Sequence, residues 1–235
     1  MINTKRIIKK ELVFTSKLDL ARFKALQCKE SNAWLHAIPS SNIGTFMDSN
    51  SIRICIGLRL GCDICLVHTC LCGSVVSARG LHGLSCLKSA GRYLRHIELN
   101  EIISRALMSL HIPNHLEPKG LSRNDGKKPD GVTLTPWSKG KPLVWDATCV
   151  DTFADSYLSK TSKKAAFAVE TMGPWSTESK NFINTIGSKL QELTGDKKSK
   201  FYLTQRISLA IQRFNASCVM GTIPAAKPLE EIFYL

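Results

Sequence analysis

The sequence has no apolar run long enough to cross a membrane, and its first residues carry no secretory signal. That opening stretch, MINTKRIIKKELVF, is charged and has no long apolar segment. The chain also has no internal repeat and no low-complexity segment. These absences argue against a repeat architecture, and they predict an intracellular protein without a membrane partner.

Acidic residues are few: the chain has 19 Asp and Glu and 32 Lys and Arg, which gives a formal net charge of +13. A pI near 9.4 on a chain of 235 residues points to a polyanionic partner such as nucleic acid. The alternative is a basic surface that serves solubility alone. The hydrophobic content of 43% is that of an ordinary globular chain, and the length suits one large domain or two small ones.

Apolar spacing predicts helices over residues 16–28, with Ser16 as the cap, and over residues 91–110. In the second helix, the pattern assigns Leu94 to an apolar side and Arg95 to the opposite, polar side. Two more helices are predicted in the last third of the chain, over NFINTIGSKLQEL and FYLTQRISLAIQRFNAS.

Short extended pieces lie between these helices. Residues 52–60 alternate in a way that predicts a strand, although a helix capped by Asp48 also fits. After Ile112, the segments HLEP, DGVTLT and PLVWDATCV are separated by Gly, Pro, Asn and Lys, as strands are. Helix, strands and two helices in this order predict a layered α/β structure.

Cysteine, in contrast, is abundant, since six of the nine cysteines lie between Cys55 and Cys86. In a reducing compartment such a cluster favours metal binding or catalysis over disulfides. The spacing Cys70-x-Cys72, nine residues, His82, three residues, Cys86 can close a tetrahedral and therefore structural zinc site. The alternative is a set of small side chains buried in a core. Three neighbouring residues are near enough in sequence to replace one ligand: Cys62, Cys65 and His68.

Two aspartates flank a predicted hairpin. Asp130 follows Pro129 and leads into GVTLT, and Asp146 interrupts the apolar run PLVWDATCV on the strand face opposite Trp145. Pairing through the loop PWSKGK would bring the two carboxylates together, and a divalent cation relieves their repulsion while binding water and phosphate oxygen. The pair indicates Mg²⁺-assisted phosphodiester hydrolysis. The alternative makes Asp130 a turn residue and Asp146 a hydrogen-bonded strand residue.

The segments GLHGLSCLKSAGRYLRHIELNEII and LEPKGLSRNDGKKPDGVTLTPWSKGKPLVWDATCVDT resemble the C-terminal region of non-LTR retrotransposon and reverse-transcriptase-like proteins. That region is similar to a restriction-enzyme-like endonuclease domain, a relative of the PD-(D/E)xK nucleases, with an upstream C-C-H-C zinc cluster. The likeness extends over most of the chain. It is most specific at the Cys/His cluster, at the Arg95-His96 pair and at the PD…D pair.

This resemblance implies an α/β fold with a PD-(D/E)xK nuclease-like core, a short mixed sheet flanked by helices. A helical segment and a small zinc-stabilised loop region would precede it. The predicted organisation is an N-terminal helical and linker segment at 1–60, a Cys/His zinc-binding segment at 61–90, the endonuclease-like α/β domain at 91–224 and a tail at 225–235.

The resemblance also implies roles for single residues. Asp130 and Asp146 would be catalytic and hold Mg²⁺, with Glu101, or Glu117 in its place, as a further ligand. For Glu101 a solvated position beside Arg105 is the alternative. In the family the C-C-H-C cluster helps to hold nucleic acid, and its ligands fall on Cys70, Cys72, His82 and Cys86.

One departure from the family concerns the catalytic lysine. The simplest PD-(D/E)xK arrangement has it two residues beyond the second acid, where this chain has Thr148. In the retrotransposon branch the lysine moves to the following helix, and here Lys163 and Lys164 are the candidates in a shortened segment. Three further basic residues would contact phosphates: Arg95, Lys127 and Lys128.

The function that the resemblance implies is a Mg²⁺-dependent cut of DNA at a retrotransposon target site, in the nucleus, with RNA as a second candidate partner. The chain lacks a paired-aspartate polymerase motif, so an upstream reverse-transcriptase domain of a full-length element would be a further partner. The competing prediction is a nucleic-acid-binding remnant with the same fold and zinc site that does not cleave.

Overall fold

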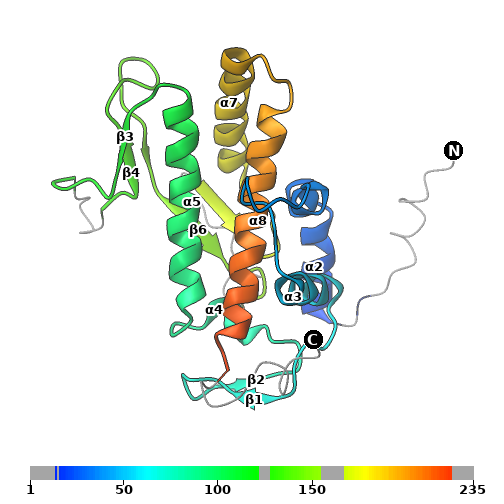
Figure 1. Cartoon of the computed structure of the whole chain (residues 1–235). Coiled ribbons are helices and arrows are strands. Elements are labelled where there is room, and N and C mark those ends of the chain that lie inside the picture. Colours follow the sequence, from blue (N-terminus) through cyan, green and yellow to red (C-terminus); the bar gives the residue numbers. More distant parts are fainter. Residues whose placement is uncertain (1–13, 15, 122–127, 155–166, 224–235) are drawn as a thin grey trace, which may run out of the picture.

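Figure 1 shows the computed structural model, which describes residue 14 and residues 16–121, 128–154 and 167–223. Helices and three small sheets surround one long helix, α8 (Ser199–Met220). The protein is therefore of the mixed α/β class, as the order of predicted elements indicates. None of the helices in the described ranges is long and apolar enough to cross a membrane.

Helix α8 joins two hydrophobic cores. Ile207 and Ile211 belong to the core formed with α5 (Ala90–Ser109) and the strands, whereas Ala216 and Val219 belong to a second core near the N-terminal helices. All four side chains are fully buried. A helix with apolar side chains on every side must be covered on every side, which explains the central position of α8.

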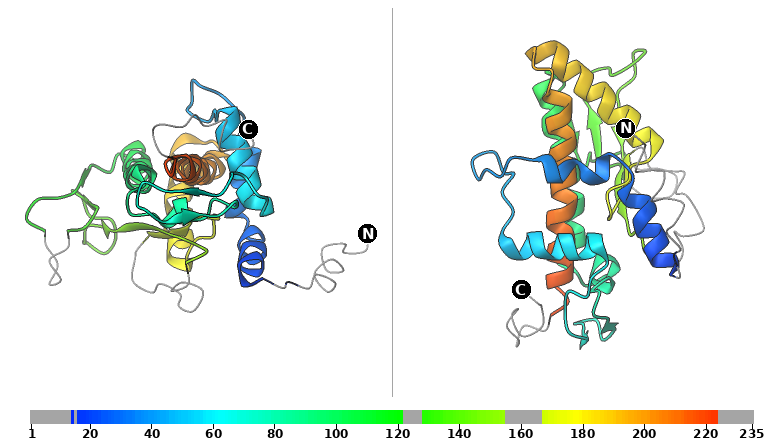
Figure 2. Two further views of the ribbon diagram at one scale, coloured as in Figure 1. Left: turned by 90° about the horizontal axis from the view of Figure 1, so that it is seen from below. Right: turned by 90° about the vertical axis from the view of Figure 1, so that its right-hand side faces the viewer.

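Two helical segments pack against α8 on one side, the 3-10 helix η1 (Glu30–His36) and α3 (Ser49–Leu60), and α2 (Lys17–Leu26) contacts η1. Figure 2 shows α3 lying across α8. The strand predicted over residues 52–60 is wrong, and the alternative of a helix capped by Asp48 is confirmed. The alternation misleads because Ile54 and Leu58, one helical turn apart, are buried while Leu60 is 69% exposed.

The other core, which contains Ile207 and Ile211 of α8, lies between α5, α7 (Thr177–Thr194) and the strands. An antiparallel sheet has the order β3 (Asn114–Leu116), β4 (Gly131–Thr133), β5 (Val144–Trp145). A separate parallel pair joins β6 (Ala147–Val150) to β7 (Phe167–Glu170). The predicted hairpin is confirmed, because Gly131 is opposite Trp145 and Val132 is opposite Val144.

The Trp145 side chain fixes this hairpin to the core. It is 1% exposed, and its indole donates a hydrogen bond to Asn100 Oδ1 at 3.0 Å. Gly131 leaves the space for the ring, since an added Cβ there would lie 2.0 Å from Trp145 Cζ2. Val144, the neighbour of Trp145 in the strand, is 48% exposed, so the two faces alternate as predicted.

Helix α5 agrees with the predicted bounds but not with the predicted faces. Leu94 is 45% exposed, whereas Arg95 is only 2% exposed. The Arg95 guanidinium donates to Asn215 Oδ1 of α8 at 2.6 Å. The assignment of Arg95 to the polar, solvent side is therefore wrong, because α8 supplies a buried polar partner that the pattern of α5 alone does not reveal.

The cysteine-rich segment forms a hairpin and a short helix against the end of α8. Its elements are β1 (His68–Thr69), β2 (Val75–Val76) and α4 (His82–Ser85). Val76 and Leu84 are buried in the same core as Val219. This segment is thus packed onto the protein through its own apolar side chains, and its cysteines lie next to that contact.

Candidate metal centre and acidic site

The four predicted zinc ligands come together at the end of the molecule that carries β1 and β2. Cys70 and Cys72 lie in the turn between these strands, His82 begins α4 and Cys86 follows it. Their ligand atoms all lie within 4.8 Å of one another. The cluster can therefore hold a metal ion with protein side chains alone.

The distances fit a tetrahedral arrangement. Cys70 Sγ and Cys86 Sγ are 3.7 Å apart, and Cys72 Sγ is 3.2 Å from His82 Nε2. Two thiolates at ~2.3 Å from one tetrahedral ion would lie roughly 3.8 Å apart. None of the nine cysteines, all in the described ranges, forms a disulfide. The four side chains thus have the chemistry and spacing that a closed structural site needs.

The two cysteines of the turn differ in their electrostatics. Hydrogen bonds from the Ser74 side chain and backbone N–H lower the pKa of the Cys72 thiol to about 6. Burial raises the pKa of Cys70, which is 4% exposed. A low pKa favours the thiolate, which is the form that binds a metal.

The alternative ligands are turned to other partners. Cys65 is fully buried, with its Sγ 3.4 Å from the carbonyl oxygen of Ala78. His68 Nε2 lies 2.9 Å from Thr222 Oγ1 of the segment after α8. Cys62 is exposed at the end of α3. Within the described residues, the compact group contains Cys70, Cys72, His82 and Cys86, as their spacing predicts.

The PD aspartate, Asp130, lies where β4 begins and contacts both α5 and β6. Its Oδ1 lies 3.2 Å from His96 Nε2, and its Oδ2 accepts a hydrogen bond from the Ala147 N–H at 2.6 Å. Burial alone would raise the pKa of Asp130, but the hydrogen bonds from His96 and Ala147 outweigh it and lower the pKa. The carboxylate is therefore held in its charged form.

The same contact shifts the pKa of His96 upward, opposite to the shift of Asp130. The hydrogen bond to Asp130 raises its pKa, although burial acts against the charged imidazole, and the nearby charge of Glu117 adds to the rise. His96 and Asn100 are four residues apart on α5 and so face the same way. Sequence reasoning gave neither a role, and their helical spacing opposite the PD segment was the signal that could have found them.

Asp146 lies between β5 and β6 and is half-buried. The Asp130 N–H donates to the Trp145 carbonyl oxygen at 3.0 Å, although Gly131 is the residue opposite Trp145 in the ladder of β4 and β5. The Asp130 carboxylate accepts from the N–H of Ala147, the residue after Asp146. The hairpin thus brings the two aspartates near each other along the backbone, and an ion shared by their carboxylates stays a prediction.

Glu101 and Glu117 are the two candidates for a third acidic ligand beside Asp130 and Asp146. Glu101 is on the exposed side of α5, and Arg105 Nη2 lies 2.7 Å from Glu101 Oε2. This is the solvated ion pair that was the alternative for Glu101. Glu117 is closer in the backbone, since its N–H donates to the Asp130 carbonyl oxygen at 2.9 Å, and its side chain is exposed.

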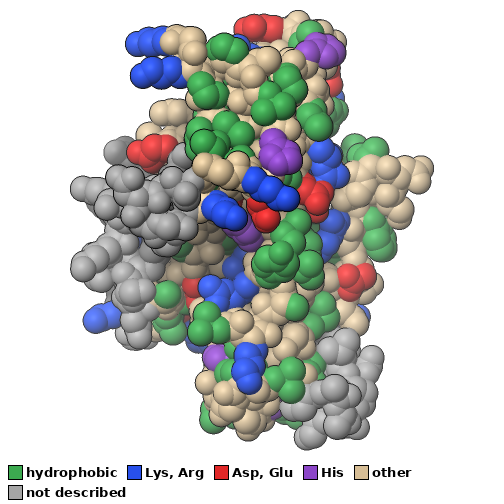
Figure 3. Space-filling view, turned by 90° about the vertical axis from the view of Figure 1, so that its left-hand side faces the viewer, with side chains coloured by type: hydrophobic (Ala, Val, Ile, Leu, Met, Phe, Trp, Pro, Cys, Tyr) green, Lys and Arg blue, Asp and Glu red, His purple; other side chains and the backbone are tan. Residues whose placement is uncertain are grey.

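A cavity of about 330 Å³ opens beside His96. Arg92 and Arg95 of α5 line it together with Thr148 of β6, the residue at the lysine position of the simplest nuclease arrangement. Figure 3 shows acidic, basic and histidine side chains together in the middle of the face that carries α5 and the β3–β5 sheet. An anion that entered the cavity would meet Arg92, which is half-buried.

The remaining basic candidates are placed differently. Arg95 is buried and bonded to Asn215 although it also lines the cavity beside His96, and its predicted contact with phosphate stays a prediction. Lys128 is exposed two residues before Asp130. Lys127, Lys163 and Lys164 lie outside the described residues.

Fold and cluster together define an α/β protein with a Cys₃His group that can bind a metal ion. Comparison with protein-family models finds no match. Comparison with curated proteins finds no match either.

Proposed function

We propose that this chain is a transposon-derived, nuclease-like protein in which Asp130 and Asp146 hold Mg²⁺ for hydrolysis of a DNA phosphodiester. The observation that carries the proposal is the Asp130 carboxylate, which is kept charged by His96 and by the N–H of Ala147, the residue that follows Asp146. Carboxylate oxygens are the ligands that Mg²⁺ prefers in proteins. On this proposal the core is of the PD-(D/E)xK type.

Each residue of the site has a separate task in the proposed reaction. Asp130 and Asp146 bind the ion, His96 orients Asp130, and Arg92 contacts the phosphate in the adjoining cavity. When bound, Mg²⁺ stabilises negative charge on phosphorus and activates the attacking water. A lysine of residues 160–164, Lys163 or Lys164, would supply the remaining cation.

A nicking assay on supercoiled plasmid with Mg²⁺ tests this proposal. We expect the wild type to nick, and Asp130→Asn and Asp146→Asn each to lose at least about 100-fold in rate, since each removes a charged ligand of the ion. Asp196→Asn, an exposed aspartate in the connection between α7 and α8, is the matched control. Nicking that survives both site substitutions would refute the assignment.

The second candidate is a protein that binds nucleic acid without cutting it. Thr148 at the lysine position favours it, as does the Glu101–Arg105 pair. Among the described residues, no compact group of three acidic, histidine or cysteine ligands forms around Asp130. Salt-sensitive binding of DNA by a wild type that never nicks would select this candidate. Both candidates keep DNA as the main partner, RNA as a second, an upstream reverse-transcriptase domain and the nucleus as the location.

We further propose that the Cys₃His group holds zinc and stabilises residues 61–90. Metal analysis of reduced protein should find about one zinc per chain, lost in Cys70→Ser and Cys86→Ser and retained in Cys62→Ser. Chelation should raise amide hydrogen exchange in this segment more than in α5. Reduced protein that contains no zinc would remove the claim.

A further inference from the structure

A basic cavity lies apart from the one beside His96. A cavity of about 720 Å³ opens between η1, α7 and the start of α8. None of its lining residues belongs to the cavity beside His96. Its function is open, and neither the nuclease site nor the Cys₃His group uses it.

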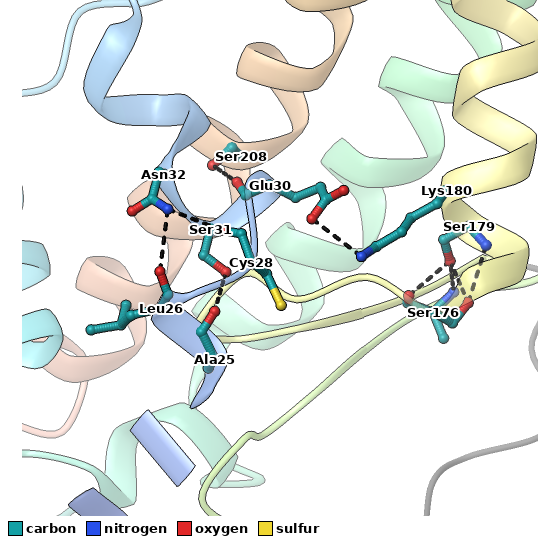
Figure 4. A network of polar contacts seen from close by, with 11 residues as sticks. Ala25, Leu26, Cys28, Glu30, Ser31, Asn32, Ser176, Ser179, Lys180 and Ser208 are labelled. Atoms are coloured by element: carbon teal, nitrogen blue, oxygen red, sulfur yellow. Dashed lines mark hydrogen bonds and ion pairs between the residues drawn. The ribbon is translucent and has the colours of Figure 1, made fainter. Parts of the chain in front are cut away.

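Positive charge dominates the lining. Among the described residues around the cavity, a single carboxylate, Glu30, faces four lysines and one histidine: Lys29, Lys180, Lys197, Lys200 and His36. Lys180 of α7 reaches across to η1, with its Nζ 3.4 Å from Glu30 Oε2 (Figure 4). This ion pair neutralises one lysine, and the others leave a net positive surface that favours an anionic ligand.

The same cavity offers an aromatic face. Phe201 lines it near the start of α8 and is 46% exposed, so its ring is accessible from the cavity. Lys200, its neighbour, is held beside α7, because Gly187 has no side chain and an added Cβ would lie 2.7 Å from Lys200 Cγ. The packing of α7 against α8 thus places the Phe201 ring and the Lys200 side chain at the same edge of the cavity.

Three amide side chains complete the lining: Asn32, Asn184 and Gln191. The Asn32 and Gln191 amides already donate to backbone carbonyl oxygens of the protein. The wall also contains Trp175, whose buried indole N–H makes no hydrogen bond to any described residue. An unpaired buried donor is costly, so a ligand that brings an acceptor has something to gain there.

We propose that this cavity binds a segment of single-stranded nucleic acid, with a base stacked on Phe201 and the neighbouring phosphates on Lys197 and Lys200. Exposed aromatic rings beside lysines are how proteins hold unpaired strands, since every base has a face that can stack. A duplex hides its base faces and does not fit a concave site of this kind. The proposal goes beyond the nuclease site and does not depend on it.

Binding of a fluorescein-labelled oligothymidylate of about 12 nucleotides, followed by anisotropy, tests the proposal. Phe201→Ala should weaken binding roughly tenfold, because the base loses the ring on which it stacks. Phe46→Ala is the matched control, since Phe46 is also exposed, at 53%, and is not part of the cavity. The control should change the affinity less than about twofold.

A double substitution separates charge from stacking. Lys197→Gln with Lys200→Gln should reduce the salt dependence of binding by about 1.4 units, as the loss of two phosphate contacts on a single strand predicts. Lys88→Gln with Lys119→Gln, two exposed lysines outside the cavity, should leave it unchanged. Equal losses in the Phe201→Ala and Phe46→Ala variants would overturn the proposal, and so would a wild type that does not bind the oligonucleotide.

Two comparisons keep this test apart from the nuclease test. The oligonucleotide binding is measured without added Mg²⁺, so a failure of the nicking assay leaves the result intact. Polyglutamate, a polyanion without bases, serves as a competitor. If it displaced the oligonucleotide equally from the wild type and from Phe201→Ala, the cavity would bind charge alone and the proposed stacking would be contradicted. Circular dichroism of each variant confirms that the fold is retained.

Discussion

Arg95 and His96 are neighbours in sequence, but the structure gives them different surroundings. Arg95 is enclosed between α5 and α8 and bonded to Asn215, whereas His96 faces the Asp130 carboxylate at the surface. One residue step on a helix turns the side chain by roughly 100°, which is enough to move it from the interior to a site. The Arg95-His96 pair therefore links the core to the acidic site.

This placement predicts that Arg95 acts in stability and not in binding phosphate. Arg95→Ala should lower the free energy of unfolding by roughly 3 kcal/mol, since it leaves a hole and removes the donor to Asn215 Oδ1. Arg92→Ala, from the half-buried arginine of the same cavity, should cost less than about 1 kcal/mol. Urea denaturation measures both.

The opposite result has a clear signature. If Arg95→Ala kept its stability and reduced the salt slope of DNA binding by about one unit, Arg95 would be a phosphate contact after all. The placement in the fold would then be wrong at this residue. Arg92→Ala is expected to give the salt-slope change instead.

Residue spacing predicted the metal cluster but not the contacts of the acidic site. Cys70, Cys72, His82 and Cys86 lie close in sequence, so the spacing is enough to bring their side chains together. Asp130 meets His96 only because α5 packs beside the β4–β5 hairpin, and a local pattern contains no information on that packing. The same reason explains the incorrect position predicted for Arg95.

At the scale of elements, α3 depends on Asp48, the N-cap residue that precedes it. The Asp48 side chain accepts hydrogen bonds from the Ser51 N–H at 2.9 Å and from the Ser51 hydroxyl at 2.6 Å. These bonds lower the pKa of Asp48. A carboxylate with a lowered pKa stabilises the fold above its unfolded value near 3.8, and this contribution is lost as the pH falls through the lowered pKa.

Asp48→Ala should therefore reduce the free energy of unfolding by about 1 kcal/mol at pH 7. Asp48→Asn is the matched control, because an asparagine caps a helix almost as well and does not titrate. Its stability should change less than that of the wild type as the pH falls from 5 toward 3, measured by thermal unfolding. Equal stability of all three proteins at pH 7 would mean that the cap contributes nothing.

Helices with local signals were predicted well, and elements that depend on distant partners were not. The helix α7 has its Ser176 cap, with the Ser176 side chain accepting from the Ser179 N–H, and its apolar period within its own sequence. The strand β7 pairs in parallel with β6 across a long connection and was missed. For residues 52–60, the alternation fitted a strand, and the Asp48 cap was the better guide.

At the scale of the whole molecule, α8 makes the N-terminal helices and the Cys₃His segment one structure with the α/β part. Ala216 and Val219 belong to one core, and Ile207 and Ile211 to the other. Loss of zinc should therefore loosen the C-terminal end of α8 as well as residues 61–90. Amide hydrogen exchange should then rise at Val219 and stay unchanged at Ile207.

The net charge of +13 bears on the partner at this scale. A positive net charge favours binding of a polyanion whether or not the protein cleaves it, so the charge alone does not separate a nuclease from a binding protein. The distinction rests on the two carboxylates at Asp130 and Asp146. Their ability to share one divalent ion is the central claim.

Binding of Mn²⁺ in place of Mg²⁺, followed by electron paramagnetic resonance on zinc-loaded protein, measures that claim most directly. Mn²⁺ accepts the same oxygen ligands as Mg²⁺ and reports its own binding. We predict about one bound Mn²⁺ per wild-type chain, at least about tenfold weaker binding in both Asp130→Asn and Asp146→Asn, and unchanged binding in Asp196→Asn. Mn²⁺ binding that is equal in all four proteins, or absent from the wild type, would contradict the shared ion.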